Sequence, residues 1–131
     1  MSVSLPGGTS LVTGACTLYF PTLSYILSQS ILASGIGKAC AIAFAKAGVT
    51  GLFLADINDS GLEDTIIQCK KNASHAQFRA VPKKVDVTKE DDVVAMVQDA
   101  VTEFGRLDYA ANVAGVCILS QSIIIPELMP R

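Results

Sequence analysis

The sequence is poor in the residue types that mark metal-binding and nucleic-acid-binding proteins. It contains one histidine, His75, and its four cysteines form no Cys-x-x-Cys pair, which argues against a zinc site. Charged residues make up 17% of the chain, with 12 acids against 10 bases. No basic run exceeds two lysines, so nothing marks a surface for nucleic acid or an anionic membrane. We expect no metal and neither of these partners.

The first 37 residues contain no charged side chain at all. Since a secretory signal peptide opens with a basic segment, we expect none. The most apolar stretch, residues 16–33, contains Thr, Ser, Gln and Pro throughout, and these polar groups would lack partners at bilayer depth. We therefore expect no membrane-spanning segment and a cytoplasmic protein.

The cysteines allow two interpretations. Their even number could form two disulfides, but three of the four lie in apolar, periodic segments, where a buried reduced thiol acts as a small hydrophobic side chain. The second interpretation is favoured and agrees with a reducing compartment. The residues are Cys16, Cys40, Cys69 and Cys117.

What the chain does contain is apolar residues, at 50%, with a mean hydropathy of +0.46 over 131 residues. This length allows one domain at most, and the composition is that of a packed globular chain. Short β-branched runs alternate with helical patterns from residue 36 to residue 115, which is typical of βαβ units and a parallel sheet. The predicted strands cover residues 9–13, 51–55, 78–87 and 107–113. Pro82 cannot donate a ladder hydrogen bond, so the third strand is expected to lie at an edge or to have an irregular entry.

Three segments have the apolar spacing of helices. The first covers residues 36–47. The second opens with a capping box of Ser60 and Glu63, and the third opens with Thr88 and Asp91 as its cap. The apolar face of the third helix is predicted to comprise Val93, Val94, Val97, Val101 and Phe104, with Met96 in the core. Glu90, Asp91 and Asp92 are assigned to its first turn, where acids complement the helix dipole, and His75 to a solvated loop.

A glycine motif follows the first strand. Thr13 and Gly14 end that strand, residues 33–37 (Ala-Ser-Gly-Ile-Gly) open a helix, and Asp56 ends the next strand, 19 residues beyond Gly37. Glycines let the backbone approach a pyrophosphate, the helix N-terminus offers free N–H groups, and the acid accepts hydrogen bonds from ribose hydroxyls. A Gly-x-Gly pair alone could equally be a tight turn with close helix packing. Strand, helix and acid together favour dinucleotide binding.

With residues 16–32 set aside, the segment reads LVTGA-ASGIGKACAIAFAKAG and resembles the short-chain dehydrogenase/reductase family. Thr13, Gly14, Gly35 and Gly37 match the family's T-G-x-x-x-G-x-G loop, and Asp56 its acid after the second strand. The family's Asp-Val motif is matched by Asp86 and Val87. Its Asn-Asn-Ala-Gly motif is matched by residues 112–115 (Asn112, Val113, Ala114 and Gly115), except that Val113 stands where the family has its second Asn. The resemblance covers residues 9–15 and 33–115.

The resemblance implies an NAD(P)-dependent oxidoreductase that acts on a small alcohol or ketone. It also implies that a complete form could be a homo-oligomer. The implied cofactor-binding residues are Thr13, Gly14, Ser34, Gly35, Ile36, Gly37, Asp56, Asp86, Val87, Asn112, Ala114 and Gly115. We expect NAD rather than NADP, because Asp56 would repel a 2′-phosphate and neither Ser34 nor Ile57 supplies a cation.

The catalytic part that the family implies is missing. It consists of a Ser and a Tyr-x-x-x-Lys pair, in which the Lys lowers the pKa of the Tyr. Four residues after Tyr19, Tyr25 and Tyr109 come Leu23, Gln29 and Val113, so no catalytic residue is assigned. Without the cation, a phenol near its ordinary pKa is a poor proton shuttle at neutral pH.

Gly14 and Gly35 lie 21 positions apart, against four in the family, an excess of 17 residues. Residues 16–32 are interpreted as a retained in-frame intron, with a genuine lid-forming insertion as the alternative, and we expect them to disrupt pyrophosphate binding. The hexapeptide Ile-Leu-Ser-Gln-Ser-Ile occurs within them, at 26–31, and again at 118–123. The sequence offers no physical account of this repeat.

The predicted fold is an α/β, incomplete doubly wound, Rossmann-like parallel sheet of about four strands in the spatial order 3-2-1-4. The domain prediction is a single truncated dinucleotide-binding domain over residues 1–131, with an insertion at 16–32 and a divergent tail at 116–131. Three functions remain open. They are a dehydrogenase by lineage, a non-catalytic nucleotide-binding or interaction fragment, and an inactive product of mis-splicing or gene decay.

Overall fold

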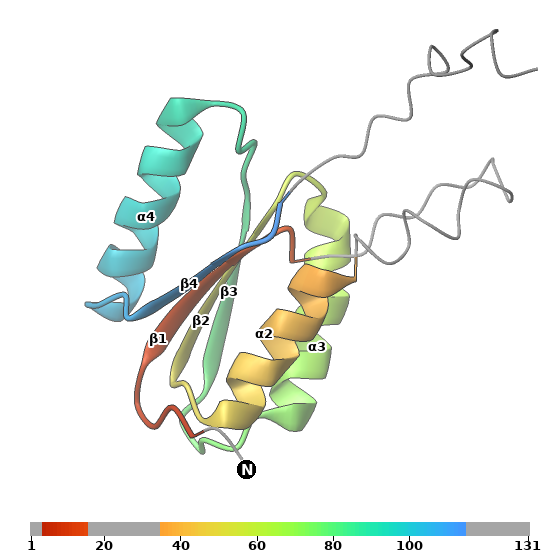
Figure 1. Ribbon diagram of the computed structural model, residues 1–131, viewed down its shortest axis with the longest axis vertical. Helices are drawn as coiled ribbons and strands as arrows, with labels where there is room; N and C mark the ends of the chain where they lie inside the picture. Colours follow the sequence, from red (N-terminus) through yellow and green to blue (C-terminus); the bar gives the residue numbers. More distant parts are fainter. Residues whose placement is uncertain (1–3, 16–34, 115–131) are drawn as a thin grey trace, which may run out of the picture.

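The computed structural model describes residues 4–15 and 35–114, and there it shows a parallel sheet with helices on both faces (Figure 1). The strands are β1 (Thr9–Thr13), β2 (Gly51–Asp56), β3 (Arg79–Lys84) and β4 (Tyr109–Asn112). The helices are α2 (Ile36–Ala47), α3 (Leu62–Asn72) and α4 (Glu90–Phe104), with a short 3-10 helix, η1 (Asp59–Gly61), before α3.

The four strands run in the order β3-β2-β1-β4 and every pair is parallel, which confirms the predicted order. In this register Thr13 lies beside both Ala55 and Asn112, and Asp56 lies beside Lys84. The C-terminal ends of all four strands therefore meet at one edge of the sheet. That edge is where ligands bind in open α/β folds.

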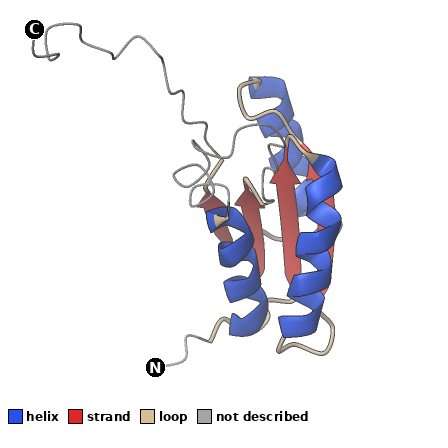
Figure 2. Cartoon of the chain, turned by 90° about the vertical axis from the view of Figure 1, so that its right-hand side faces the viewer, coloured by secondary structure: helices blue, strands red, loops and turns tan. Residues whose placement is uncertain are grey.

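The helices divide between the two faces according to the direction in which each connection crosses the sheet (Figures 1 and 2). Right-handed crossovers from β1 to β2 and on to β3 place α2 and α3 on one face, and the return to β4 places α4 on the other. The first core cluster lies under α2 and α3 and the second under α4. The larger buried side chains of the two clusters are Val12, Leu52, Leu54 and Leu62 in the first and Leu11, Phe53, Val85 and Met96 in the second.

Local sequence signals placed several elements correctly. β1 and α2 have the predicted bounds, and Gly48 ends α2 with a left-handed backbone, φ 101°. β2 is fully buried along five residues, as expected of a central strand, and extends one residue further, to Asp56. β3 and β4 are shorter than predicted, and β3 lies at an edge of the described sheet, as the proline indicated.

Both predicted side-chain caps are wrong. The Ser60 hydroxyl donates to Asn58 Oδ1 at 2.7 Å, and α3 begins only at Leu62, after η1. The Thr88 hydroxyl donates to Asp86 Oδ1 at 2.6 Å, and the residue that precedes α4 is Lys89. In each case a nearby acceptor in the preceding turn takes the hydroxyl that would have capped the helix.

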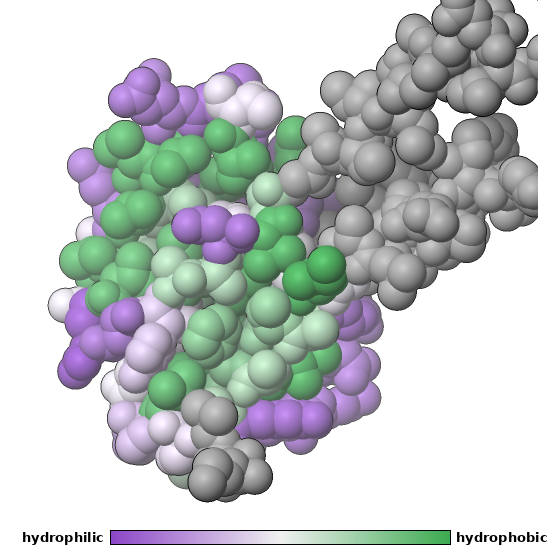
Figure 3. All heavy atoms as spheres, viewed as in Figure 1, coloured by the Kyte–Doolittle hydropathy of each residue, from purple (hydrophilic) through white to green (hydrophobic). Residues whose placement is uncertain are grey.

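The apolar face of α4 is rotated from its predicted position. Met96 and Ala100 are buried and Val93 and Phe104 are partly buried against the sheet. Val94, Val97 and Val101, which were predicted to lie on the apolar face of the helix, are 39% to 49% exposed. Figure 3 shows apolar side chains gathered over α4 and along β4, the other edge strand of the described sheet. Among the described residues α4 is the one helix on this face, and on its side turned away from the sheet Val94, Val97 and Val101 are exposed.

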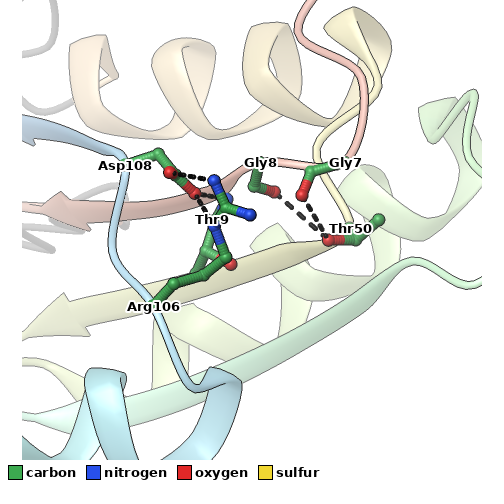
Figure 4. Close-up of polar contacts among 6 residues, drawn as sticks. All are labelled: Gly7, Gly8, Thr9, Thr50, Arg106 and Asp108. Carbon is green, nitrogen blue, oxygen red and sulfur yellow. Dashed lines mark hydrogen bonds and ion pairs between the residues drawn. The ribbon is translucent and has the colours of Figure 1, made fainter.

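The edge of the sheet opposite the strand C-termini is held by polar contacts (Figure 4). Asp108 accepts hydrogen bonds from the Thr9 N–H at 2.8 Å and from the Arg106 guanidinium at 2.6 and 2.8 Å. The Arg106 guanidinium holds the pKa of the Asp108 carboxyl below its usual range. Thr50 donates to the carbonyls of Gly7 and Gly8. These contacts fix the starts of β1 and β4 and lie away from the predicted site.

Two cysteines lie within the described residues, and both are free thiols. Cys69 is fully buried in the first core cluster, and this burial raises its pKa to about 11. Cys69 thus has the buried position that the sequence indicated, Cys40 is partly buried, and Cys16 and Cys117 lie outside the described residues. None of the helices described is both long and apolar enough to span a bilayer.

Ser10 gives a prediction about stability. Its Oγ is buried beneath the helices, and within residues 4–15 and 35–114 it has no hydrogen-bond partner. A buried hydroxyl without a partner costs about 1–3 kcal/mol, so we expect Ser10→Ala to leave the free energy of unfolding unchanged or to raise it by about 1 kcal/mol. Urea denaturation measures the effect.

Thr13→Ala is the matched control for Ser10→Ala. It removes a β1 hydroxyl that accepts two backbone hydrogen bonds, so it should lower the free energy of unfolding by about 1–2 kcal/mol. A loss of similar size in Ser10→Ala would contradict the absence of a partner for Ser10.

Candidate cofactor-binding site

The structure brings the predicted site residues to the C-terminal edge of the sheet. Thr13 and Gly14 end β1, Asp56 ends β2, Asp86 and Val87 follow β3, and Asn112 and Ala114 lie at the end of β4. Gly35, Ile36 and Gly37 open α2 at the same edge. Ser34 and Gly115 lie outside the described residues.

The start of α2 packs directly on the end of β1. A Cβ on Gly37 would lie 1.9 Å from the Gly14 carbonyl oxygen, so no other residue fits there without a shift of the backbone. Gly14 has φ +69°, and a Cβ on it would lie 2.9 Å from the Ala114 backbone. The 19 residues from 16 to 34 therefore do not keep the helix away from the strand, and their effect on pyrophosphate binding stays a prediction.

Thr13 joins β1 to the chain that follows β4. Its hydroxyl oxygen accepts the N–H groups of Val113 at 3.1 Å and Ala114 at 3.2 Å. The side chain is buried, with 3% exposed. Thr13 thus positions the backbone beside Gly14, a supporting role that the sequence motif alone did not reveal.

Thr65 is a residue that the sequence reasoning missed. Its hydroxyl donates to the Ala15 carbonyl at 2.8 Å, across 50 positions of sequence, and the side chain is fully buried. The N–H groups of Gly14 and Ala15 both point to the Ala55 carbonyl, at 2.8 and 3.4 Å. One signal could have found Thr65, because it lies three residues from Leu62 and four from Cys69 on the buried face of α3.

Asp56 is half-buried at the end of β2. Its Oδ1 accepts the Asn58 N–H at 2.9 Å, an Asx turn that orients the carboxylate at the strand end. Ile57 follows it and is 56% exposed. A carboxylate held at this edge can accept hydrogen bonds from sugar hydroxyls.

Asp86 is engaged with its own loop. Oδ1 accepts both the backbone N–H and the hydroxyl of Thr88, and these bonds hold the pKa of the Asp86 carboxyl below its usual range. The Asp86 N–H donates to Asp92 in the first turn of α4, at 3.1 Å. Val87 is exposed beside it, as is Ile36 at the start of α2. Together with Ile57, these side chains provide apolar surface at the same edge as the glycines.

The first turn of α2 carries no acidic residue, which leaves the positive end of its dipole open to an anion. Lys38 in that turn forms an ion pair with Asp64 of α3, and the Lys38 ammonium holds the pKa of the Asp64 carboxyl below its usual range. Elsewhere, within the chain segments that the structure describes, no cluster of three His, Cys, Asp or Glu side chains could hold a metal ion.

Residues 32–128 match the family model of the short chain dehydrogenases, and the chain belongs to that family. The match runs 13 residues beyond residue 115, where the resemblance found in the sequence stopped. The family consists of oxidoreductases that bind NAD(P) and act on small molecules. The predicted fold and lineage are thereby confirmed.

Two curated relatives and one solved structure illustrate the relationship. Short-chain dehydrogenase srdC of Neurospora crassa is 46% identical over 84 residues, which cover 64% of this chain and 31% of that protein. The (S)-acetoin-forming diacetyl reductase of Staphylococcus epidermidis is 38% identical over 95 residues, covering 72% of this chain and 35% of that protein.

The structure of a short chain dehydrogenase from Mycobacterium smegmatis superposes with a TM-score of 0.66 at 25% identity, covering 88% of this chain and 40% of that one. This chain therefore spans about a third of the length of the curated relatives that it matches.

Proposed function

We propose that this chain is the cofactor-binding part of an NAD(P)-dependent short chain dehydrogenase, with the dinucleotide along the C-terminal edge of the sheet. The observation that carries the proposal is the packing of Gly37 on the Gly14 carbonyl, with Asp56 at the end of the neighbouring strand. Both glycine positions have no room for a side chain, which is the backbone geometry that a pyrophosphate loop requires.

Each part of the edge has a distinct task in this proposal. The free N–H groups at the start of α2, from Gly35 to Gly37, bind the pyrophosphate, and Asp56 accepts hydrogen bonds from the adenosine ribose. Asp86 and Val87 border the adenine. Asn112, which lies beside Thr13 in the β1–β4 register, and Ala114, whose N–H donates to the Thr13 hydroxyl, support the other half of the cofactor. When bound, the nicotinamide ring supplies hydride transfer to or from an alcohol or ketone.

The 131 residues do not contain the groups that would move the accompanying proton. No Tyr in the chain has a Lys four residues later. We therefore propose that this polypeptide binds the cofactor without turning it over, and that catalysis needs a Ser and a Tyr-x-x-x-Lys pair from a complete form. A non-catalytic nucleotide-binding fragment and a mis-spliced or decayed product are the alternatives.

We expect the cofactor-binding part to prefer NADH over NADPH. The Asp56 carboxylate would repel a 2′-phosphate and would lose its bonds to the ribose hydroxyls. A hydrogen bond to a charged group contributes about 1.5–3 kcal/mol, so Asp56→Ala should weaken NADH binding roughly 10- to 100-fold and leave NADPH binding equal or stronger. Fluorescence titration with both nucleotides measures the dissociation constants.

Two controls sharpen this measurement. Asp59→Ala removes an exposed acid only three residues further along, in η1, and should leave NADH binding within about twofold of the unaltered chain. Lys84→Ala removes the cation beside Asp56 in the β2–β3 register and tests whether that lysine attracts the 2′-phosphate. Tighter binding of NADPH than of NADH by the unaltered chain would contradict the predicted preference.

A further inference from the structure

The first turn of α3 contacts the chain on both sides of residues 16–34. Before that segment, the Ala15 carbonyl accepts the Thr65 hydroxyl at 2.8 Å. After it, Lys38 of α2 forms an ion pair with Asp64, the residue next to Thr65. Two consecutive side chains of one helix thus contact the described chain on either side of residues 16–34.

The Thr65 contact is the stronger of the two. Both Thr65 and Ala15 are fully buried. A side chain without a hydroxyl at position 65 would therefore leave the buried Ala15 carbonyl without this hydrogen bond. The Asp64 side chain is 61% exposed, and ion pairs at such exposed positions stabilise little on their own. We therefore expect Thr65 to account for most of the effect and Lys38 with Asp64 for a smaller part.

The length of the connection determines whether such contacts matter. In a loop with the family spacing of four between the glycines, the covalent chain itself keeps Gly14 beside the start of α2. Here Gly14 and Gly35 are 21 positions apart, so the covalent connection restrains the start of α2 much less. Noncovalent contacts must then hold the Gly14 carbonyl against Gly37.

We propose that Asp64 and Thr65 form a clamp that keeps Gly14 and Gly37 packed together despite the long connection between them. The clamp positions the pyrophosphate-binding backbone without touching the cofactor. Its consequence for nucleotide affinity rests on the proposed function, whereas its consequence for the packing of α2 on β1 does not.

The test is a double-mutant cycle between the clamp and the length of the connection. Thr65→Val is made in the full chain and in a variant lacking residues 16–32, which restores the spacing of four. In the full chain we expect NADH affinity to fall about tenfold and exchange of the Ala39 amide, which donates to the Gly35 carbonyl at 3.0 Å, to accelerate about tenfold. In the shortened variant both changes should stay within about twofold.

Matched variants separate the clamp from general destabilisation. Thr65→Ser keeps the hydroxyl and should restore both quantities in the full chain. Thr102→Val removes a hydroxyl that bonds within α4 and should change neither. Lys38→Met should reproduce a smaller part of the Thr65→Val effect, again only in the full chain.

The outcomes for the clamp and for the proposed function are distinguishable. Equal acceleration of Ala39 exchange in the full and shortened chains would overturn the clamp, whatever the nucleotide data show. Absence of NADH binding by every variant, including the shortened one, would overturn the proposed function, while the exchange comparison would still decide the clamp.

Discussion

A polypeptide of these 131 residues is expected to show no dehydrogenase turnover with any alcohol or ketone, even at saturating NAD. General acid–base catalysis by a positioned side chain contributes roughly 10²–10⁴ in rate, and the sequence offers no Tyr-x-x-x-Lys pair to supply it. Tyr109, the tyrosine within the described residues, begins β4 at the edge of the sheet opposite the candidate site. Its ring stacks on Phe44 at a centroid distance of 6.1 Å. It therefore lies where it cannot exchange a proton with a substrate at the strand C-termini.

The measurement is a steady-state assay of NADH formation or consumption on the full chain and on the variant lacking residues 16–32. The shortened variant serves as the control for binding, because it should bind NADH at least as well as the full chain and still show no turnover. Turnover by the full chain that disappears in Asp56→Ala would contradict the prediction, since it would place a proton donor among residues that we regard as non-catalytic.

Gly37→Ala is expected to have the largest effect on stability of any single substitution considered for this chain. In an ordinary helix this change would stabilise by about 1 kcal/mol through helix propensity. Here the new Cβ would lie 1.9 Å from the Gly14 carbonyl oxygen and 2.6 Å from its carbonyl carbon. These are backbone atoms directly after β1, which cannot give way as the end of a flexible side chain would, so α2 must move away. We expect a loss of about 2–3 kcal/mol in the free energy of unfolding and loss of measurable NADH binding.

Urea denaturation and NADH titration on the same protein measure the two effects. Gly7→Ala is the control for the conformational cost of replacing a glycine, because Gly7 has φ +77° but nothing lies within 4 Å of its added Cβ. It should cost about 1 kcal/mol and leave binding unchanged. Unchanged or increased stability of Gly37→Ala would show that α2 does not pack on Gly14 as described.

Much of the framework follows from local sequence. The run at β1, the periodicity of α2 with Gly48 after it, and the uninterrupted apolar run of β2 each indicate one element with little ambiguity. The alternation of strands and helices then leaves few topologies, because crossovers are right-handed. The strand order is therefore a consequence of chain direction and handedness more than of any individual side chain.

The errors arise where two local interactions compete for one group. Ser60 and Thr88 have the sequence pattern of helix caps, but Asn58 and Asp86 lie close enough to accept their hydroxyls. The pattern of α4 likewise predicts one broad apolar face, while the sheet covers only the part around Met96. Which part of an apolar face is buried depends on the neighbouring elements, which a periodic pattern does not specify.

At the candidate site, too, some features follow from local sequence and others depend on contacts between distant residues. The glycines and Asp56 are recognisable because the requirements for a tight backbone and an acid at a strand end are local. Thr65 is not recognisable in this way, since its partner lies 50 positions earlier. The closeness of Gly14 and Gly37 across residues 16–34 is also a property of the folded structure, and spacing alone predicts the opposite.

The central position of β1 has a consequence for the order in which the molecule folds. β1 pairs with β2 over a separation of 42 residues, Thr9 with Gly51, and with β4 over 99, Ser10 with Tyr109. Removing 17 residues from the first separation would speed its closure only about twofold, because loop entropy grows with the logarithm of length. The pairing with β4 spans most of the chain and must wait until residue 109 has been synthesised, so it should be the late event of folding. Until then the Thr13 hydroxyl cannot accept hydrogen bonds from the N–H groups of Val113 and Ala114, and the nucleotide-binding edge remains incomplete.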